Sequence, residues 1–295
     1  MKFSILVAQY NNGRFFKPFY DSIINQRYDN WEVIIVDDCS TDNSIDLMNE
    51  LIKDDHRFKL YTNEYNRGCG YTKRRCIELA TSEICGFADP DDALTIDAIE
   101  IMIQTHLDHP EISLAHSCYY LCDENLKVTN IGTSSKSVTV SKYFTNLDLS
   151  VTQFTSFKKS FYNSTEGINP KLTRAVDQDL ILKLSEIGPF KFINQPLYFY
   201  RIHAGGISTN TNSIKAFYMF LKVVSAAELR REISLEEIVE PYLSGRETLM
   251  YTEQRLNDSL GFLLKNIIRL IRKRPIYYLK RLITVFRKFI NRTAS

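Results

Sequence analysis

Residues 31–42 read WEVIIVDDCSTD and join an apolar β-branched run to an abrupt polar stop. The run Val33-Ile34-Ile35-Val36 lacks polar alternation, which is typical of a strand covered on both faces. Asp37 to Asp42 then supply the small polar residues that form turns and cap helices. Apolar residues recur after them at helical spacing, at Ile45, Met48, Leu51 and Ile52. The stretch therefore predicts a buried strand that leads into a helix.

The same alternation of strand and helix continues on both sides of this stretch. Further strands are predicted at 3–8, 58–61 and 84–88. Further helices are predicted at 16–24, at 71–81, and from Thr95 through His106. Such a series of βα units indicates an α/β fold with a mostly parallel sheet and helices on both of its faces.

Polar residues gather where these strands end, at Asn11, Asp37, Asp38 and Asp89-Pro90-Asp91-Asp92. Parallel α/β sheets bind ligands at that edge. Three carboxylates within four residues repel one another unless a cation neutralises them. Bound Mg²⁺ or Mn²⁺ would do so, and would stabilise a leaving diphosphate. A solvated helix cap is the alternative interpretation of the acidic run.

Two common nucleotide-binding motifs are missing from the sequence. Gly68 and Gly70 are not followed by a third glycine at 73, which is Lys, so the dinucleotide fingerprint fails. No GxxxxGK[ST] run occurs either. Both facts disfavour dehydrogenases and P-loop enzymes.

An ordered set of motifs over residues 1–208 resembles the inverting glycosyltransferase family 2, which has the GT-A (Rossmann-like) fold. The set comprises residues 4–11 (SILVAQYN), Gln26 with 31–42, Asn66-x-Gly68 with Lys73, 87–92 (FADPDD), 177–180 (DQDL) and 200–203 (YRIH). The resemblance implies an enzyme that transfers a sugar from a UDP-sugar to an acceptor hydroxyl. The acceptor would be a lipid-linked glycan or a bacterial surface polysaccharide, such as a lipopolysaccharide or capsule.

The resemblance also implies which side chains bind the nucleotide-sugar. Tyr10 would flank the base, as aromatic rings can. Asp38 would accept a hydrogen bond from a base N–H, which favours uracil, while Asp37 would shape the turn. Lys73 would meet the base or a phosphate, and Asp89 would lie near the ribose.

The implied metal ligands for Mn²⁺ or Mg²⁺ are Asp91, in the Asp-x-Asp-Asp motif, and His203. Asp92 is a rival to Asp91 that the sequence cannot separate from it. Imidazole is a competent ligand for ions of this type. A structural histidine is the alternative interpretation of His203.

Asp177 is the implied catalytic base. Inversion in one displacement needs a carboxylate to take the acceptor proton as the oxygen attacks the anomeric carbon. The family usually has Glu-Asp here, whereas this chain has Val176-Asp177. Asp179 is the alternative base, and both acids could instead be charges that favour a helix N-terminus.

The charge of the chain is unevenly distributed. Residues 259–295 contain ten Lys and Arg and no Asp or Glu, which leaves 27 basic and 35 acidic residues in 1–258, a net charge of −8. In this basic tail, apolar residues recur at helical spacing on both sides of Pro275. The tail predicts two amphipathic helices on an anionic membrane surface. Packing on the catalytic domain or on a second subunit is the alternative.

Composition bounds the setting of the protein. Hydrophobic residues make up 44% and charged residues 24%, as in globular domains. The six cysteines are expected as reduced thiols, and Cys118 with Cys122 lack the second pair that a zinc site needs. The N-terminal residues show no export signal, and no apolar run has the length of a membrane span. We expect a cytoplasmic protein, peripheral at the inner face of the cell membrane.

The predicted domains are a catalytic domain at 1–210 and a helical C-terminal extension at 211–295. The catalytic domain would consist of a nucleotide-binding half (1–110) and an acceptor-side half (111–210). In the second half the sequence predicts a hairpin at 112–131, a helix at 176–187, and short strands at 190–193 and 196–200. Residues 132–175 show no clear pattern.

Two other functions fit part of the sequence. A nucleotidyltransferase also joins a Rossmann-like sheet to carboxylates and a metal, but it leaves Asp177 and His203 unexplained. A non-catalytic module that binds a nucleotide-sugar or a membrane would explain the loss of Glu before Asp177. Nucleic acid is not an expected partner because the body is acidic and no recognised motif occurs. Whether the protein forms a homo-oligomer stays open.

Overall fold

The computed structural model describes residues 1–132, 151, 153–203 and 212–231. The chain divides into the units Met1–Glu232 and Ile233–Ser295, and every described residue belongs to the first. The basic tail at 259–295 lies outside the described residues. The domain boundaries expected from the sequence remain predictions.

The first half of the sheet consists of four parallel strands in the order β3-β2-β1-β4. They are β1 (Phe3–Gln9), β2 (Trp31–Asp37), β3 (Phe58–Thr62) and β4 (Ile84–Phe87). β1 and β2 pair in register from Phe3 and Trp31 to Gln9 and Asp37. Their carboxyl ends therefore meet at one edge of the sheet, as the sequence predicts.

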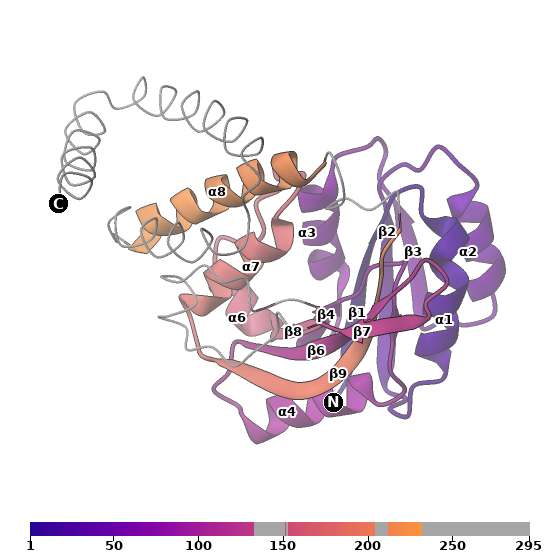
Figure 1. The fold of residues 1–295 in the computed structure, drawn as a ribbon, viewed down its shortest axis with the longest axis horizontal. Coiled ribbons are helices and arrows are strands. Elements are labelled where there is room, and N and C mark those ends of the chain that lie inside the picture. The colour runs from indigo at the N-terminus through magenta and orange to yellow at the C-terminus, as the bar shows by residue number, and fades with distance from the viewer. Residues whose placement is uncertain (133–150, 152, 204–211, 232–295) are drawn as a thin grey trace. The chain divides into compact units, whose positions relative to one another are not determined.

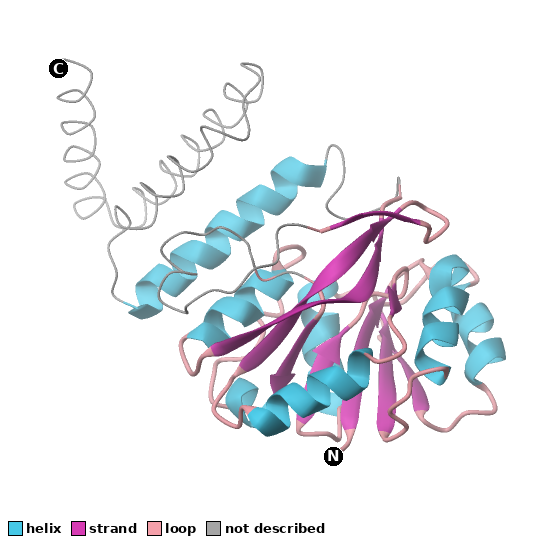
Figure 2. Ribbon diagram, turned by 60° about the horizontal axis from the view of Figure 1, so that its bottom comes forward, coloured by secondary structure: helices cyan, strands magenta, loops and turns pink. Residues whose placement is uncertain are grey.

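Helices cover both faces of these strands (Figures 1 and 2). One face packs on α1 (Phe16–Ile24), α2 (Ser44–Ile52) and α4 (Ala98–Asp108). α3 (Cys69–Leu79) packs on β1 and β2, and α7 (Val176–Ser185) packs on α3 and on α8 (Asn212–Arg231). Phe3, Ile5 and Val7 belong to the core beneath α1, while Leu6 between them is equally buried. Because side chains alternate along a strand, burial of both sets means that both faces are covered.

The second half of the sheet is mixed in direction. β8 (Thr155–Lys158) runs antiparallel to β4 and joins it to β6 (Leu114–Cys122), followed by β9 (Phe190–Arg201) and β5 (Ala93–Leu94). β7 (Val128–Ile131) pairs with β6 as the predicted hairpin. η1 (Gly13–Phe15) and α6 (Lys159–Asn163) complete the described elements. The expected α/β fold class is confirmed.

The structure differs from the sequence-based elements in three places. Residues 190–193 and 196–200 form one strand, β9, and not two; Pro196 lies within it, where the register with β6 shifts. A proline lacks the N–H for a regular ladder, so it interrupts the pairing without ending the strand. The helix predicted from Thr95 begins at Ala98, and the Thr95 hydroxyl hydrogen-bonds to Asp97. β8 and α6 lie in the region that showed no clear pattern. Among the described helices, none is long and apolar enough to cross a bilayer.

Candidate active site

The loops after β1 and β2 are tied together at the carboxyl edge of the sheet. Asn11, which has φ of 53°, donates its backbone N–H to the Ser40 hydroxyl at 2.9 Å, and its Oδ1 accepts the Thr41 N–H at 2.9 Å. Asp37 accepts the Ser40 N–H at 2.7 Å, so it shapes this turn as predicted. Tyr10 lies beside these loops with 44% of its surface exposed. Its ring is therefore accessible to a ligand.

Asp38 is buried and holds the loop that leads into α3. Its Oδ1 accepts hydrogen bonds from Asn63 Nδ2 at 2.7 Å and from the Arg67 N–H at 2.8 Å, and its Oδ2 accepts the Gly68 N–H at 2.7 Å. Gly68 has φ of 85°, a conformation that favours glycine. A carboxylate has about four acceptor positions, so one remains on Oδ2. The base contact of Asp38 stays a prediction.

Lys73 on α3 faces Asp89 after β4. The Lys73 Nζ lies 3.6 Å from Asp89 Oδ1 and 4.9 Å from the centre of the Phe87 ring. Burial acts to lower the pKa of Lys73, but the nearby Asp89 and Asp177 carboxylates raise it. The ammonium therefore stays charged at the point where β4 ends.

Asp91 of the acidic loop contacts His203, which follows β9, with 2.8 Å between Asp91 Oδ2 and His203 Nε2. The Phe15 ring lies 4.7 Å from the imidazole, centre to centre. Burial and the charge of Asp89 raise the pKa of Asp91, while the His203 contact opposes them. The buried Nδ1 of His203 has no hydrogen-bond partner among the described residues. A cation at this carboxylate would relieve the repulsion from Asp89.

Asp92 is used within the fold. It is 2% exposed, and its Oδ1 accepts the Arg201 backbone N–H from β9 at 2.7 Å. The Tyr198 hydroxyl, which accepts the Asp89 N–H at 2.9 Å, also hydrogen-bonds to Asp92. Burial and the charges of Asp91 and Asp89 raise the pKa of Asp92 well above its ordinary value. These contacts fasten the acidic loop to β9.

The Arg201 side chain joins three segments around the loop. Its guanidinium donates to the backbone carbonyls of Asp91 and Glu124 and lies 4.8 Å from the centre of the Phe15 ring. Sequence reasoning missed Phe15 and Tyr198 as parts of the site. Tyr198 shares a face of β9 with Tyr200 by alternation, but nothing in the sequence pairs it with Asp89. Contacts between residues so far apart in the chain come from the sheet order.

Asp177 and Asp179 differ sharply in their surroundings, although both are in the first turn of α7. Asp177 is exposed and makes no hydrogen bond to the described residues. Asp179 is buried, and its Oδ2 accepts the Asn169 N–H at 2.8 Å and the Lys183 ammonium at 2.9 Å. Asp177 is thus the carboxylate of the two that is available to an acceptor.

The acidic loop and His203 offer a partial ligand set for a divalent cation. No three His, Cys, Asp or Glu side chains of the described residues converge as a complete metal site. Mg²⁺ in nucleotide-binding sites is commonly held by one or two carboxylates, with substrate phosphates and water completing its coordination. Asp91 and His203 fit such an incomplete set, because carboxylate and imidazole are both ligands for Mn²⁺-type ions.

Comparison with known proteins agrees with this arrangement. Residues 4–165 match the family model described as glycosyl transferase family 2. The chain is similar to a chondroitin synthase of Escherichia coli, with 29% identity over 259 residues, 87% of this chain and 37% of that protein. It is also similar to an Escherichia coli UDP-Glc:alpha-D-GlcNAc-diphosphoundecaprenol beta-1,3-glucosyltransferase, with 30% identity over 122 residues, 41% of this chain and 47% of that protein. The chain thus spans less than half of the length of either relative.

Solved structures share the fold. The S. aureus TarS fragment 1–349 in complex with UDP-GlcNAc superposes with a TM-score of 0.67 at 19% identity, covering 86% of this chain and 78% of that one. A mannosyltransferase from Pyrobaculum calidifontis, in complex with GDP-Man and Mn²⁺, superposes with a TM-score of 0.56 at 14% identity, covering 89% of this chain and 79% of that one. The second structure shows that a nucleotide-sugar and a divalent cation can occupy this fold together.

Proposed function

The chain belongs to glycosyl transferase family 2, and from this premise we propose that it transfers a sugar from a UDP-sugar to a hydroxyl group of a glycan acceptor. The observation that carries the proposal is the acidic loop itself. It presents Asp91 against His203 and Asp89 against Lys73 at the carboxyl edge of the sheet. A nucleoside diphosphate is anionic, so it needs the cations that such an arrangement can supply.

In this proposal the nucleotide lies along the carboxyl ends of β1, β2 and β4. Tyr10 flanks the base, the free acceptor position of Asp38 receives a base N–H, and Asp89 lies near the ribose. Lys73 contributes positive charge toward the phosphates. Uracil suits this position because its N3–H can donate to a carboxylate.

Asp91 and His203 are the side chains that would hold Mn²⁺ or Mg²⁺. Such an ion supplies charge stabilisation for the departing diphosphate. Asp91 is better suited than Asp92, because the oxygen of Asp92 already accepts the Arg201 N–H in the interior. Among the described residues, Asp91 is the only side chain to which the His203 imidazole is hydrogen-bonded.

Asp177 acts as the base in the proposed transfer. The acceptor oxygen forms a bond to the anomeric carbon, and the bond from that carbon to the diphosphate breaks, with its electron pair leaving on UDP. Asp177 takes the acceptor proton. Its exposure at the start of α7 supports this role, while the buried pairing of Asp179 with Lys183 argues against Asp179.

The acceptor is proposed to be a polysaccharide or a lipid-linked glycan, in keeping with the names of the two relatives. We also propose a cytoplasmic protein whose basic tail, 259–295, binds the anionic inner face of the membrane. Deletion of 259–295 should then lower the membrane-bound fraction. The family match favours glycosyl transfer over nucleotidyl transfer, which would release pyrophosphate in place of UDP.

Release of UDP from a panel of UDP-sugars, with and without Mn²⁺, tests the function. Slow metal-dependent hydrolysis by the intact protein is expected, with losses in Asp91→Ala and Asp177→Asn. Loss of a general base commonly lowers the rate by about 10²- to 10⁴-fold. Asp21→Asn, on the exposed surface of α1, is the matched control and should retain the rate. Failure of the folded protein to bind or hydrolyse any UDP-sugar would overturn the proposal.

A further inference from the structure

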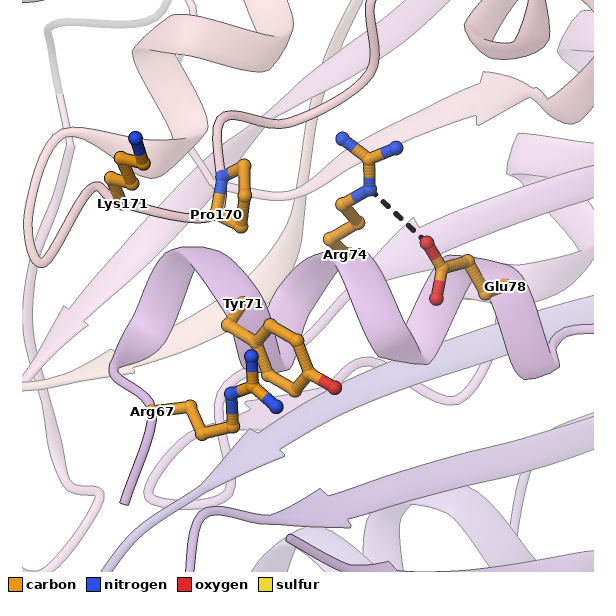
Figure 3. A pocket seen from close by; sticks show the side chains of 6 residues that line it. All are labelled: Arg67, Tyr71, Arg74, Glu78, Pro170 and Lys171. Carbon is orange, nitrogen blue, oxygen red and sulfur yellow. Dashed lines mark hydrogen bonds and ion pairs between the residues drawn. The ribbon is translucent and has the colours of Figure 1, made fainter. Parts of the chain in front are cut away.

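A pocket of about 290 Å³ lies between α3 and the segment that precedes α7. Figure 3 shows its lining: Arg67, Tyr71, Arg74, Glu78, Pro170 and Lys171. Tyr71, Arg74 and Glu78 are three and four positions apart, so they form one stripe along α3. Lys73, which faces Asp89, lies on a different side of that helix. The pocket is therefore separate from the side of α3 that faces the acidic loop.

The lining carries three cations and a single acid. Arg74 is committed to the fold, since its Nε lies 3.1 Å from Glu78 Oε1 and its Nη1 donates to the Ile168 carbonyl at 3.2 Å. The side chains of Arg67 and Lys171 form no ion pair or hydrogen bond with the described residues. Within the part of the chain that the structure describes, two positive charges at the rim thus have no acidic partner, although residues 1–258 carry a net charge of −8.

The Arg67 guanidinium stacks on neighbouring rings and has no acidic partner among the described residues. Its guanidinium lies 3.7 Å from the centre of the Tyr71 ring and 5.1 Å from that of Tyr65. A guanidinium stacked on an aromatic face keeps its N–H donors at the edge of its plane. Those donors match the oxygens of a carboxylate or a phosphate, which arginine binds in pairs. The pocket therefore presents a preorganised donor for an anion.

Both walls of the pocket continue into segments that carry residues of the candidate active site. The backbone N–H of Arg67 donates to the Asp38 carboxylate, and the Gly70 N–H donates to the Leu172 carbonyl at 2.8 Å. A Cβ at Gly70 would lie 2.6 Å from that carbonyl oxygen, so the walls meet too closely for any side chain there. The segment with Leu172 leads directly into α7, which carries the exposed Asp177. Lys171, at the pocket, lies six residues before Asp177 in the chain.

We propose that this pocket is an acceptor subsite, in which Arg67 and Lys171 bind a carboxylate or phosphate group of the glycan that receives the sugar. The inference rests on the proposed function, because it takes Asp177 as the end of the site where the acceptor arrives. The donor diphosphate is assigned to the opposite side of α3, near Lys73, and cannot occupy both places. The enzyme would thus prefer acceptors that carry negative charge.

Binding of small anions tests the pocket directly. The full chain is titrated with inorganic phosphate, D-glucuronate and D-glucose at low ionic strength, followed by NMR. The double variant Arg67→Gln/Lys171→Gln should weaken binding of the anions by about tenfold or more, since hydrogen bonds to charged groups are worth at least that factor. Lys17→Gln, which removes an exposed cation on α1, should not weaken it.

The two anions distinguish the sources of the acceptor charge. Tighter binding of glucuronate assigns the pocket to an acidic sugar, and tighter binding of phosphate assigns it to a phosphate-linked glycan. Lys171→Gln alone changes an exposed side chain and should give an intermediate loss in a protein with an unchanged melting temperature. Equal anion affinity in the intact protein and the double variant overturns the proposal, as does equal binding of glucose.

Transfer kinetics test whether the anion belongs to the acceptor. With a UDP-sugar that the protein hydrolyses, 4-nitrophenyl β-D-glucuronide, 4-nitrophenyl β-D-glucoside and its 6-phosphate are compared as acceptors. A charged acceptor should have the lower KM, and the double variant should raise that KM about tenfold or more while leaving the KM of the neutral glucoside unchanged. Equal KM values, or an equal rise for charged and neutral acceptors, overturn the proposal.

The two proposals fail in different ways. If the protein binds anions through Arg67 and Lys171 but releases UDP from no UDP-sugar, the anion site is supported and the glycosyltransferase function is contradicted. A protein that hydrolyses a UDP-sugar but binds neither phosphate nor glucuronate retains the function and contradicts the pocket.

Discussion

Glu32 and Asp91 are carboxylates at opposite edges of the parallel part of the sheet, and their surroundings differ. Glu32, at the start of β2, is 1% exposed and accepts hydrogen bonds from Lys2 at 2.8 Å, Lys59 at 2.9 Å and the Ser4 hydroxyl at 2.7 Å. Burial acts to raise its pKa, but these donors hold the pKa of Glu32 well below its ordinary value. Asp91, beyond the end of β4, has a raised pKa because burial and a neighbouring carboxylate outweigh its contact with His203.

The difference separates an acid that the fold neutralises from the acid that we propose as a metal ligand. Around Glu32 the chain itself supplies the compensating cations, so the carboxylate stabilises the fold. Around Asp91 two more aspartates crowd into the same loop, and His203 is the one basic side chain among the described residues that directly contacts the Asp91 carboxylate. A site with surplus negative charge is suited to bind a cation from solution.

Asp91→Asn should produce the largest effect and acts on activity. We expect loss of about 100-fold or more in Mn²⁺-dependent UDP release, comparable to removing one preorganised charge-stabilising group from an active site. The free energy of unfolding in EDTA should stay equal or rise, because the substitution removes a partly buried carboxylate that its acidic neighbours repel. Enzyme assays and urea denaturation measure the two quantities. If Asp91→Asn retained Mn²⁺-dependent UDP release, Asp91 would not be the metal ligand that distinguishes it from Glu32.

Glu32→Gln should show the reverse pattern. Removing the buried charge leaves Lys2 and Lys59 without their acid, and we expect a loss of about 2–3 kcal/mol in unfolding free energy, less than for a fully buried pair because both lysines are partly exposed. UDP release per folded molecule should not change.

The pH dependence sharpens this second prediction. The pKa of Glu32 is lower in the folded protein than its ordinary value of 4.5. Its contribution to the free energy of unfolding is therefore fully present above pH 4.5 and is lost as the pH falls toward the folded pKa. The stability difference between the intact protein and Glu32→Gln should therefore narrow in acid. A constant difference from pH 7 to pH 3 would contradict the assigned role.

Asp92→Asn should have a smaller effect on the metal than Asp91→Asn. Asparagine keeps an oxygen that can accept the Arg201 N–H, so the tie to β9 is preserved. We expect the affinity for Mn²⁺ in the presence of UDP, measured by calorimetry, to fall by less than about tenfold. A greater loss than in Asp91→Asn would exchange the roles of the two aspartates.

His116 is a third kind of buried ionisable group, since neither a cation nor an acid compensates it among the described residues. Both of its ring nitrogens lack a hydrogen-bond partner among the described residues, and its ring lies 5.1 Å from that of Phe192, centre to centre. His116→Phe should raise the unfolding free energy by about 1 kcal/mol at pH 7, because it removes unsatisfied buried polar atoms. Lower stability in this variant would show that the imidazole has a partner it needs.

The pH profile of that variant follows from the direction of the shift. Burial lowers the pKa of His116 from its ordinary 6.5 to about 4. The unfolded chain binds the proton first, so the intact protein loses stability as the pH falls from 6.5 toward 4. The advantage of His116→Phe should widen over that interval, as urea denaturation at pH 7 and pH 5 can measure.

Much of the first, parallel half of the sheet could be predicted because its signals are local. The run Val33-Ile34-Ile35-Val36 is a strand covered on both faces, and the parallel alignment of β1 with β2 puts Tyr10 and Asp38 at one edge. The second, mixed half of the sheet was less predictable. β8 has only four residues, and both of the strands with which it pairs are distant in the chain. A local sequence pattern therefore does not predict it.

The amino-acid sequence by itself determined the strand and helix series, the carboxylates at the ends of the strands and the family to which the chain belongs. These depend on periodicity and on short ordered motifs. The tertiary structure decided which of two similar acids is free: Asp177 and Asp179 share one helical turn, yet Asp179 is paired with Lys183 and Asp177 is exposed. It also decided that Asp92 meets Arg201 while Asp91 meets His203. The burial of a side chain and its hydrogen-bond partners depend on segments that the sheet brings together from distant parts of the chain. The identity of two neighbouring aspartates therefore does not show which of them is buried and paired.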